Sequence, residues 1–201
     1  AYNASLNQLG IAYLDGKTPC LIVARGGTYY DAVVEAYQFY NSQLTKLWTF
    51  ERYCSQGQCG GASHSLRCAD VDGDGRDEIM VGSYVIDDNG QLLWDLKMGH
   101  PDHAYIGDIN IKRPGLEIYY GYETAQQKNG VCQVDAKTGA LLWGIGTPTE
   151  HVHSQGFCAD VDPNWTGMEC YGGEKREVLN PNRWLHSSGG AALSPLPLRS
   201  N

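Results

Sequence analysis

The sequence predicts an all-β protein, a β-propeller of about four blades, each a four-stranded antiparallel sheet. Two observations support this prediction. A glycine- and aspartate-rich turn between apolar strands recurs four times, and each copy is followed by a strand that carries a tryptophan. A repeat of roughly 45 residues with several short strands is typical of a propeller blade. Four such units fit either a four-bladed propeller or half of an eight-bladed one.

The turns and the tryptophans mark the units at matching distances. The tryptophans, at intervals of 46, 49 and 41 residues, are Trp48, Trp94, Trp143 and Trp184. Asp70 precedes Trp94 by 24 residues, and Asp160 precedes Trp184 by the same number. The copies of the turn span residues 12–24, 69–82, 107–121 and 159–173. We therefore expect residues 1–186 to form the propeller repeats.

The segments between these landmarks have the period of strands. Stretches such as VVEAYQFY, IMVGSYVI and LEIYYGY are rich in the β-branched and aromatic residues that favour strands. The triplets 88–90 (DNG) and 137–139 (KTG) predict hairpin turns in which Asn or Gly adopts a positive φ. From Ser187 the composition changes to SSGGAALSPLPLRSN, so residues 187–201 are expected to form an extended C-terminal tail.

Composition and charge exclude several classes of protein. The chain has 201 residues, 25 of them Gly, and a net charge of −8 from 15 Lys+Arg and 23 Asp+Glu. Nucleic acids and anionic membranes are bound by clustered Lys and Arg, so neither is expected as a partner. The longest wholly apolar run, residues 20–24, is far too short to cross a bilayer. The opening AYNASLNQ is too polar for a signal peptide, so we expect any such peptide to have been removed.

Cysteines and glycosylation motifs predict a secreted, extracellular protein. The seven cysteines include no CxxC pair, which argues against a zinc ribbon or a thioredoxin-type motif. Cys54 and Cys59 flank the loop SQGQ and are candidates for a disulfide-closed turn, but the complete pairing cannot be deduced from sequence. Asn3 and Asn164 begin N-x-S/T motifs and are candidate glycosylation sites. The odd cysteine count leaves one thiol, either buried or bonded to another chain.

The second copy of the turn, DVDGDGRDE, predicts a calcium site. Its oxygen donors are the side chains at positions 1, 3, 5 and 9 and the backbone carbonyl at position 7: Asp70, Asp72, Asp74, Glu78 and Arg76. Oxygen-rich loops with glycines at the bend wrap around hard cations, of which Ca²⁺ is the natural occupant. Flanking strands distinguish this loop from an EF-hand, and it resembles the calcium loops of integrin-type propeller repeats. The alternative, an Asx-rich turn without metal, fits the spacing less well.

The other copies of the turn are less complete. A second candidate calcium site has one residue at each side-chain ligand position: Asp160, Asp162, Asn164 and Glu169. Asn164 cannot be both glycosylated and a side-chain ligand. The third copy carries Lys112 where a further oxygen would be needed, so a plain turn is expected over residues 108–117. Asp15 in the first copy is expected to stabilise its turn by hydrogen bonds and not to bind a metal.

Two histidine clusters are further candidates for a metal or substrate site. His100 and His103 flank Asp102, while His151 and His153 would project from one face of a strand. The alternative is that they are exposed loop histidines near a blade edge. The 13 tyrosines could stack on sugar rings, but most aromatic residues of a propeller fill the space between blades.

A collinear series of motifs spans residues 10–173. It consists of AYLDGKTPCLIVARG, LTKLWTF, HSLRCADVDGDGRDEIMVGS, IGDINIKRPGLEI, DAKTGALLWG and ADVDP. The series resembles the rhamnogalacturonan endolyases, secreted polysaccharide lyases built on a large calcium-dependent β-propeller. The resemblance implies an eight-bladed propeller that cleaves the rhamnose–galacturonate backbone of pectin by β-elimination. In that reaction a base removes the proton α to the uronate carboxylate while cations neutralise the carboxylate.

The same resemblance marks four candidate catalytic residues: His64, His100, Asp102 and Glu123. Around them the chain departs from the family pattern, because Ser63 stands where the family has Asn, and Tyr105 and Tyr122 stand where it has His. These replacements remove cationic or metal-binding groups, while the framework turns and the tryptophans remain.

Two functions follow as alternatives. The first is a secreted calcium-binding propeller that acts on or binds a pectin-like acidic polysaccharide, with the lyase reaction either retained or lost. The second is a non-catalytic structural protein, a subunit of an extracellular oligomer or fibre, which would pair through open strand edges or the leftover cysteine. A third, an integrin-like protein-binding propeller, rests on the calcium loop alone.

Overall fold

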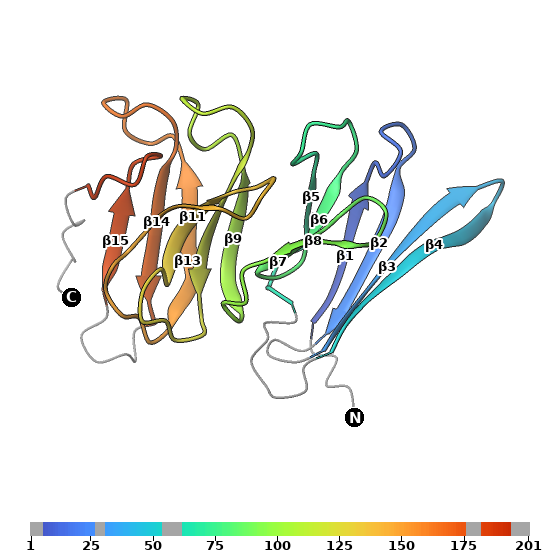
Figure 1. Cartoon of the computed structure of the whole chain (residues 1–201), viewed down its shortest axis with the longest axis horizontal. Coiled ribbons are helices and arrows are strands. Elements are labelled where there is room, and N and C mark those ends of the chain that lie inside the picture. Colours follow the sequence, from blue (N-terminus) through green and yellow to red (C-terminus); the bar gives the residue numbers. More distant parts are fainter. Residues whose placement is uncertain (1–5, 27–30, 54–61, 176–181, 194–201) are drawn as a thin grey trace. The chain divides into compact units, whose positions relative to one another are not determined.

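The computed structural model describes residues 6–26, 31–53, 62–175 and 182–193. Each of the four repeats folds into one antiparallel sheet whose strands follow one another in chain order (Figure 1). Among the described residues, the first three sheets have four strands and the fourth has three, with Ala192 adding an antiparallel bridge to His186 at its edge. The prediction of an all-β protein built from four successive antiparallel sheets is confirmed. In the described part of the chain, no helix is long and apolar enough to span a membrane.

The chain divides into two compact units, each described here by itself. The first comprises Ala1–Pro101 with the turn Lys137–Gly139, and the second comprises Asp102–Ala136 with Ala140–Asn201. The first two sheets contain β1 (Leu6–Ala12), β2 (Cys20–Gly26), β3 (Ala32–Tyr40), β4 (Gln43–Arg52), β5 (Arg67–Ala69), β6 (Glu78–Met80), β7 (Tyr84–Ile86) and β8 (Leu92–Asp95). The other two contain β9 (Pro101–Gly107), β10 (Glu117–Tyr122), β11 (Val131–Asp135), β12 (Leu141–Gly144), β13 (Val152–Ala159), β14 (Glu169–Glu174) and β15 (Arg183–His186).

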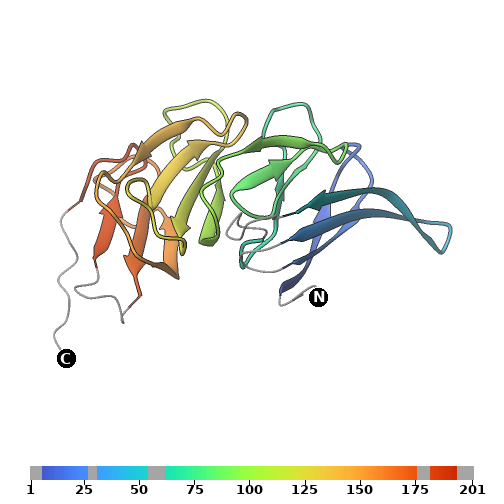
Figure 2. The ribbon, with the colours of Figure 1, turned by 60° about the horizontal axis from the view of Figure 1, so that its bottom comes forward.

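The core of the first unit lies between its two sheets. Alternate residues of β2, among them Ile22, are buried, as the period of two along a strand requires, and Val34 of β3 is fully buried beside them. They pack with Ile79 and Tyr84 of the second sheet. The hairpin of β3 and β4 extends beyond β1 and β2 (Figure 2). It exposes apolar side chains such as Phe39.

The core of the second unit is formed by both of its sheets. Ile109, Tyr119, Val152 and Cys170 are buried together, and Trp143 packs against them. Tyr119 is fully buried and therefore fills space in the core rather than presenting a ring to a sugar.

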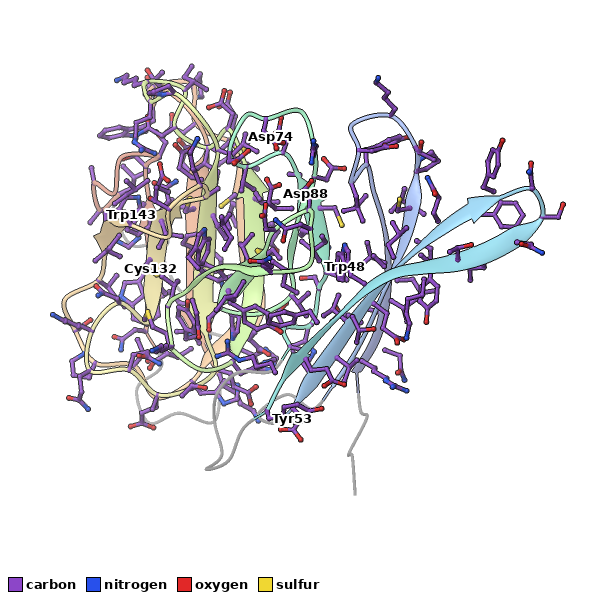
Figure 3. The ribbon with its side chains drawn as sticks, turned by 45° about the vertical axis from the view of Figure 1, so that its right-hand side comes forward. Trp48, Tyr53, Asp74, Asp88, Cys132 and Trp143 are labelled. Atoms are coloured by element: carbon purple, nitrogen blue, oxygen red, sulfur yellow. The ribbon has the colours of Figure 1, made fainter. Side chains whose placement is uncertain are left out.

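Three of the tryptophans that mark the repeats cover a glycine in the hairpin turn of the following repeat. A Cβ added at Gly90 would lie 2.7 Å from Cδ2 of Trp48, and one at Gly190 would lie 2.4 Å from Cγ of Trp143 (Figure 3). Within the first unit, Gly139 approaches Trp94 in the same way, at 2.8 Å. All three glycines have positive φ, between 71° and 84°. Each of these positions thus requires glycine for two reasons, the left-handed backbone conformation and the close approach of the tryptophan ring.

Gly190→Ala is expected to destabilise the chain by about 2–4 kcal/mol, because the methyl group would meet the Trp143 ring and the backbone would be strained. The neighbouring Gly189 has open space around its Cα and no positive φ. Gly189→Ala is the matched control and is expected to change the free energy of unfolding by less than about 0.5 kcal/mol. Urea denaturation of both variants measures the difference, and equal effects would contradict the role given to Trp143.

The chain remains attached to the fourth sheet beyond β15. Ser187 N donates to Ala191 O at 2.9 Å, and Leu193 N donates to Leu185 O at 2.8 Å. Residues 187–193, expected as the start of an extended tail, therefore form a turn on the sheet. Residues 194–201 lie outside the described residues.

The cysteines show one pair placed for a disulfide. The five described cysteines are free thiols, and the predicted partners Cys54 and Cys59, like the sequon at Asn3, lie outside the described residues. Cys158 and Cys170 face each other on β13 and β14, with their Sγ atoms 3.2 Å apart. Opposed positions on neighbouring antiparallel strands have Cα separations that a disulfide can span.

Candidate functional site

The Asp-rich turns share one structural plan. Each joins the first two strands of its sheet, and within each unit the two turns lie at the same end of the strands (Figure 1). In three copies the second strand begins with a glutamate that is at most 1% exposed: Glu78, Glu117 and Glu169. One oxygen of each accepts a backbone hydrogen bond from the turn, such as the 2.8 Å bond from Val71 N to Glu78 Oε2. A carboxylate buried to this degree requires a cation or a proton.

The first copy lacks this glutamate, because Cys20 begins its second strand. Asp15 Oδ1 instead accepts hydrogen bonds from Lys17 N and Thr18 N, at 2.9 and 2.6 Å. This is the plain turn chemistry predicted for Asp15.

The turn at residues 70–78 gathers oxygen ligands as the sequence predicts for calcium. Asp70, Asp72 and Glu78 each offer a carboxylate oxygen, and these atoms all lie within 4.8 Å of one another. The loop is closed by its own backbone, since Asp70 accepts hydrogen bonds from the N–H groups of residues 73, 74 and 75. Asp74, at the tip of the loop (Figure 3), accepts one from Arg76 N.

Glu78 is the residue of this turn whose charge is hardest to maintain without a cation. Its Oε1 is buried and has no hydrogen-bond partner among the described residues. Burial, reinforced by the negative charges of Asp72, Asp74 and Asp70, raises the pKa of Glu78 to about 7, although the hydrogen bond from Val71 N opposes the rise. A divalent cation among these oxygens would relieve both the repulsion and the unsatisfied oxygen.

The turn at residues 108–117 contains its own cation. Arg113 Nη1 donates to Glu117 Oε1 at 2.8 Å, and Nη2 donates to Asp135 Oδ2 at 2.9 Å. The guanidinium group thus occupies the place at Glu117 that a metal would take beside Glu78. Lys112 was the basic residue singled out in this turn, whereas Arg113, four positions before the buried glutamate, is the one that binds it. A basic residue at that spacing is a signal that the sequence itself carries.

The turn at residues 160–169 is intermediate between the other two. Glu169 Oε2 accepts hydrogen bonds from Val161 N and Asp162 N, while its buried Oε1 has no partner among the described residues. Asp162 Oδ1 accepts hydrogen bonds from N and Nδ2 of Asn164, at 3.0 and 2.7 Å. The turn at residues 70–78 brings three carboxylate oxygens within 4.8 Å of one another. The described turn at residues 160–169, to which Asp160 belongs, does not.

Of the four candidate catalytic residues, His64 and His100 lie together in the first unit. Their ring centroids are 5.0 Å apart in an edge-to-face arrangement. His64 is exposed, whereas His100 is fully buried with Nδ1 2.5 Å from Ala62 O. Because a carbonyl can only accept, Nδ1 of His100 is the donor in this hydrogen bond.

Asp102 and Glu123 lie together in the second unit. They offer carboxylate oxygens within 4.8 Å of each other, and Glu123 Oε1 is 3.6 Å from Nε2 of His151. The neighbouring His103 is enclosed, and burial lowers its pKa to about 4, so it is neutral at physiological pH. His103 is therefore structural, whereas Asp102, Glu123 and His151 form a polar cluster.

Comparisons with known proteins agree on one family. Residues 6–194 match the model of rhamnogalacturonan lyase family 11, C-terminal domain. Rhamnogalacturonan endolyase YesW and rhamnogalacturonan exolyase YesX of Bacillus subtilis (strain 168) are each 40% identical to the chain, over 164 and 170 residues. Both alignments cover 81% of this chain and 26% of the relative.

A solved structure supports the same assignment. The crystal structure of exotype rhamnogalacturonan lyase YesX superposes with a TM-score of 0.83 and 35% sequence identity, covering 96% of this chain and 32% of that one. The chain thus spans about a quarter of the length of the curated relatives it matches. The resemblance predicted from the motifs is confirmed. The chain belongs to rhamnogalacturonan lyase family 11, in the part that corresponds to its C-terminal domain.

Proposed function

We propose that this chain is part of a secreted, calcium-binding β-propeller that acts on or binds pectin-like acidic polysaccharide of the rhamnogalacturonan type. The observation that carries the proposal is the match to the family's C-terminal domain over residues 6–194. The four sheets would be successive blades. The repeated contact of a tryptophan with the turn glycine of the following repeat supports this order.

Calcium is proposed at the turn of residues 70–78, with a second ion at residues 160–169. The carboxylates of Asp70, Asp72 and Glu78 fit an oxygen-selective cation, and the buried Oε1 atoms of Glu78 and Glu169 lack the counter-charge that Arg113 gives Glu117. A calcium ion would hold the turns in shape. Loops of fixed shape at the ends of strands are where binding residues are commonly placed.

The β-elimination reaction requires a base and a positively polarised site for the uronate. The buried His100 ring and the exposed His64 ring are the imidazole candidates for proton abstraction. Asp102 and Glu123 would hold a proton or a cation near the substrate. Metal ions would also help to bind the negatively charged pectin, because without them the net negative charge of the protein would repel the polysaccharide.

Incubating the chain with rhamnogalacturonan and Ca²⁺ tests the proposal through two readouts. The unsaturated product of β-elimination absorbs in the near ultraviolet, and retention on immobilised polysaccharide reports binding. We expect calcium-dependent retention of the wild type. If product forms, Glu123→Gln should slow its formation at least about tenfold without abolishing retention, whereas Glu51→Gln, a change on an exposed strand position, should alter neither. Retention without product would support a chain that binds the polysaccharide without cleaving it. The absence of both retention and product would contradict the proposal.

A further inference from the structure

We propose that the second unit contains a transition-metal site, with Zn²⁺ as its occupant, formed by Asp102, His151 and His153. The two imidazoles and the carboxylate each offer one ligand atom, and the three atoms all lie within 4.8 Å of one another. The site differs in chemistry from the turn at residues 70–78, which offers oxygen atoms alone. The inference does not depend on lyase activity.

The scaffold positions the two histidines for joint ligation. His151 immediately precedes β13 and His153 lies within it, so the two side chains leave the same face of the chain. Their rings stack with centroids 5.6 Å apart and planes 26° apart. The backbone of each is anchored, since His151 O accepts from Lys175 N at 2.9 Å and His153 O is 3.1 Å from His103 Nδ1.

The carboxylate ligand comes from a different sheet. Asp102 is the second residue of β9, is 5% exposed, and is therefore held by its surroundings more firmly than a surface side chain. Glu123 places Oε1 3.6 Å from Nε2 of His151 and adds a second carboxylate beside the site. An acidic residue next to a ligating histidine commonly orients its ring and increases its basicity.

The donor set selects the class of metal. Imidazole nitrogen suits Zn²⁺ and other late first-row ions, whereas Ca²⁺ prefers six to eight oxygen ligands. Three protein ligands with an open fourth position are typical of zinc sites that bind a water or a substrate group. In this chain the fourth position would be taken by water, by the Glu123 carboxylate, or by an anionic ligand.

Metal titration of the chelator-treated full chain in the presence of excess Ca²⁺ tests the inference. We expect one Zn²⁺ to bind, and we expect Co²⁺ in its place to show the visible d–d absorption of a low-coordinate nitrogen and oxygen site without a thiolate charge-transfer band. The variant His151→Asn, His153→Asn should weaken binding by about 100-fold or more. If the double variant fails to fold, His151→Gln replaces it in the test, because it alters only one half-buried ring. We expect this single change to weaken Zn²⁺ binding about tenfold.

Glu51→Gln is the matched control, because it removes an exposed carboxylate of β4 that belongs to no proposed site and should leave Zn²⁺ affinity unchanged. The inference is overturned if the wild type binds no Zn²⁺ under these conditions, or if the histidine variants bind it as tightly as the wild type. A thiolate charge-transfer band would also overturn it, since the ion would then be held by cysteines such as Cys158 and Cys170.

Discussion

Glu78→Gln is expected to abolish most of the stabilisation that calcium gives to this chain. A ligand present at about 100 times its dissociation constant stabilises the folded state by about 2.7 kcal/mol, which is about 5–10 °C in Tm for a chain of this length. Glutamine keeps the size of the side chain and can accept the hydrogen bond from Val71 N, but it removes the charge that a cation needs. Thermal denaturation with Ca²⁺ and with EDTA measures the difference for each variant.

Glu51→Gln is the control for this experiment and should retain the full calcium-dependent shift, because Glu51 lies on β4 away from the turn. A wild-type Tm that does not respond to EDTA would contradict the calcium assignment. An equal shift in wild type and Glu78→Gln would place the stabilising ion elsewhere.

The raised pKa of Glu78 gives the calcium effect a definite pH dependence. The pKa is about 7 in the folded chain without metal and near 4.5 in the unfolded chain, so the folded state binds more protons between these values. Without calcium, stability is therefore expected to fall as pH rises from about 4.5 to 7. Calcium must displace that proton, so its stabilising shift should grow over the same window and level off above about pH 7.

Arg113→Met is expected to destabilise the chain by about 2–3 kcal/mol, less than the loss of a fully buried ion pair because the Arg113 side chain is 30% exposed. The change would leave Glu117, which has no exposed surface, without the group that neutralises it, and would also deprive Asp135 of a hydrogen bond. Methionine preserves much of the aliphatic stem, so the loss reports the charge more than the packing. Urea denaturation of the variant measures the effect.

Two controls make the Arg113 result specific. Lys112→Met changes the adjacent, exposed basic residue and should cost less than about 0.5 kcal/mol. The double variant Arg113→Met, Glu117→Gln removes both charges and should recover part of the lost stability, because a neutral amide is less costly to bury than an unpaired carboxylate. If Arg113→Met proves as mild as Lys112→Met, the guanidinium group does not replace a metal in this turn.

Much of the fold was predictable because its signals are local. Strand period, turn glycines and the recurrence of one tryptophan per repeat are read within a few residues, and they predicted an all-β chain of four antiparallel sheets. The family was predicted separately, from the resemblance of the motif series over residues 10–173. In the described residues the fourth sheet has three strands, and the segment after β15 returns along it, with Ala192 paired to His186 in an antiparallel bridge.

The candidate site was predictable only in part. The spacing of Asp70, Asp72 and Glu78 within one short loop identified an oxygen-rich cluster, because residues so close in sequence can converge without help from the rest of the fold. The pair His151 and His153 was noticed for the same reason, but their convergence with Asp102 spans about 50 residues of chain and depends on how two sheets pack.

Short-range residue patterns thus predicted the repeats, the strands and an oxygen-rich loop of calcium type, and the order of the motifs along the chain indicated the family. Tertiary structure decided which charges are buried and what neutralises them. Three glutamates at equivalent positions look alike, yet Glu117 lies beside the Arg113 guanidinium group, which also binds Asp135 on the neighbouring strand. Glu78 and Glu169 instead each keep a buried oxygen with no partner among the described residues. The energy of a buried charge is determined by the atoms packed around it, and those atoms come from segments that only folding brings together.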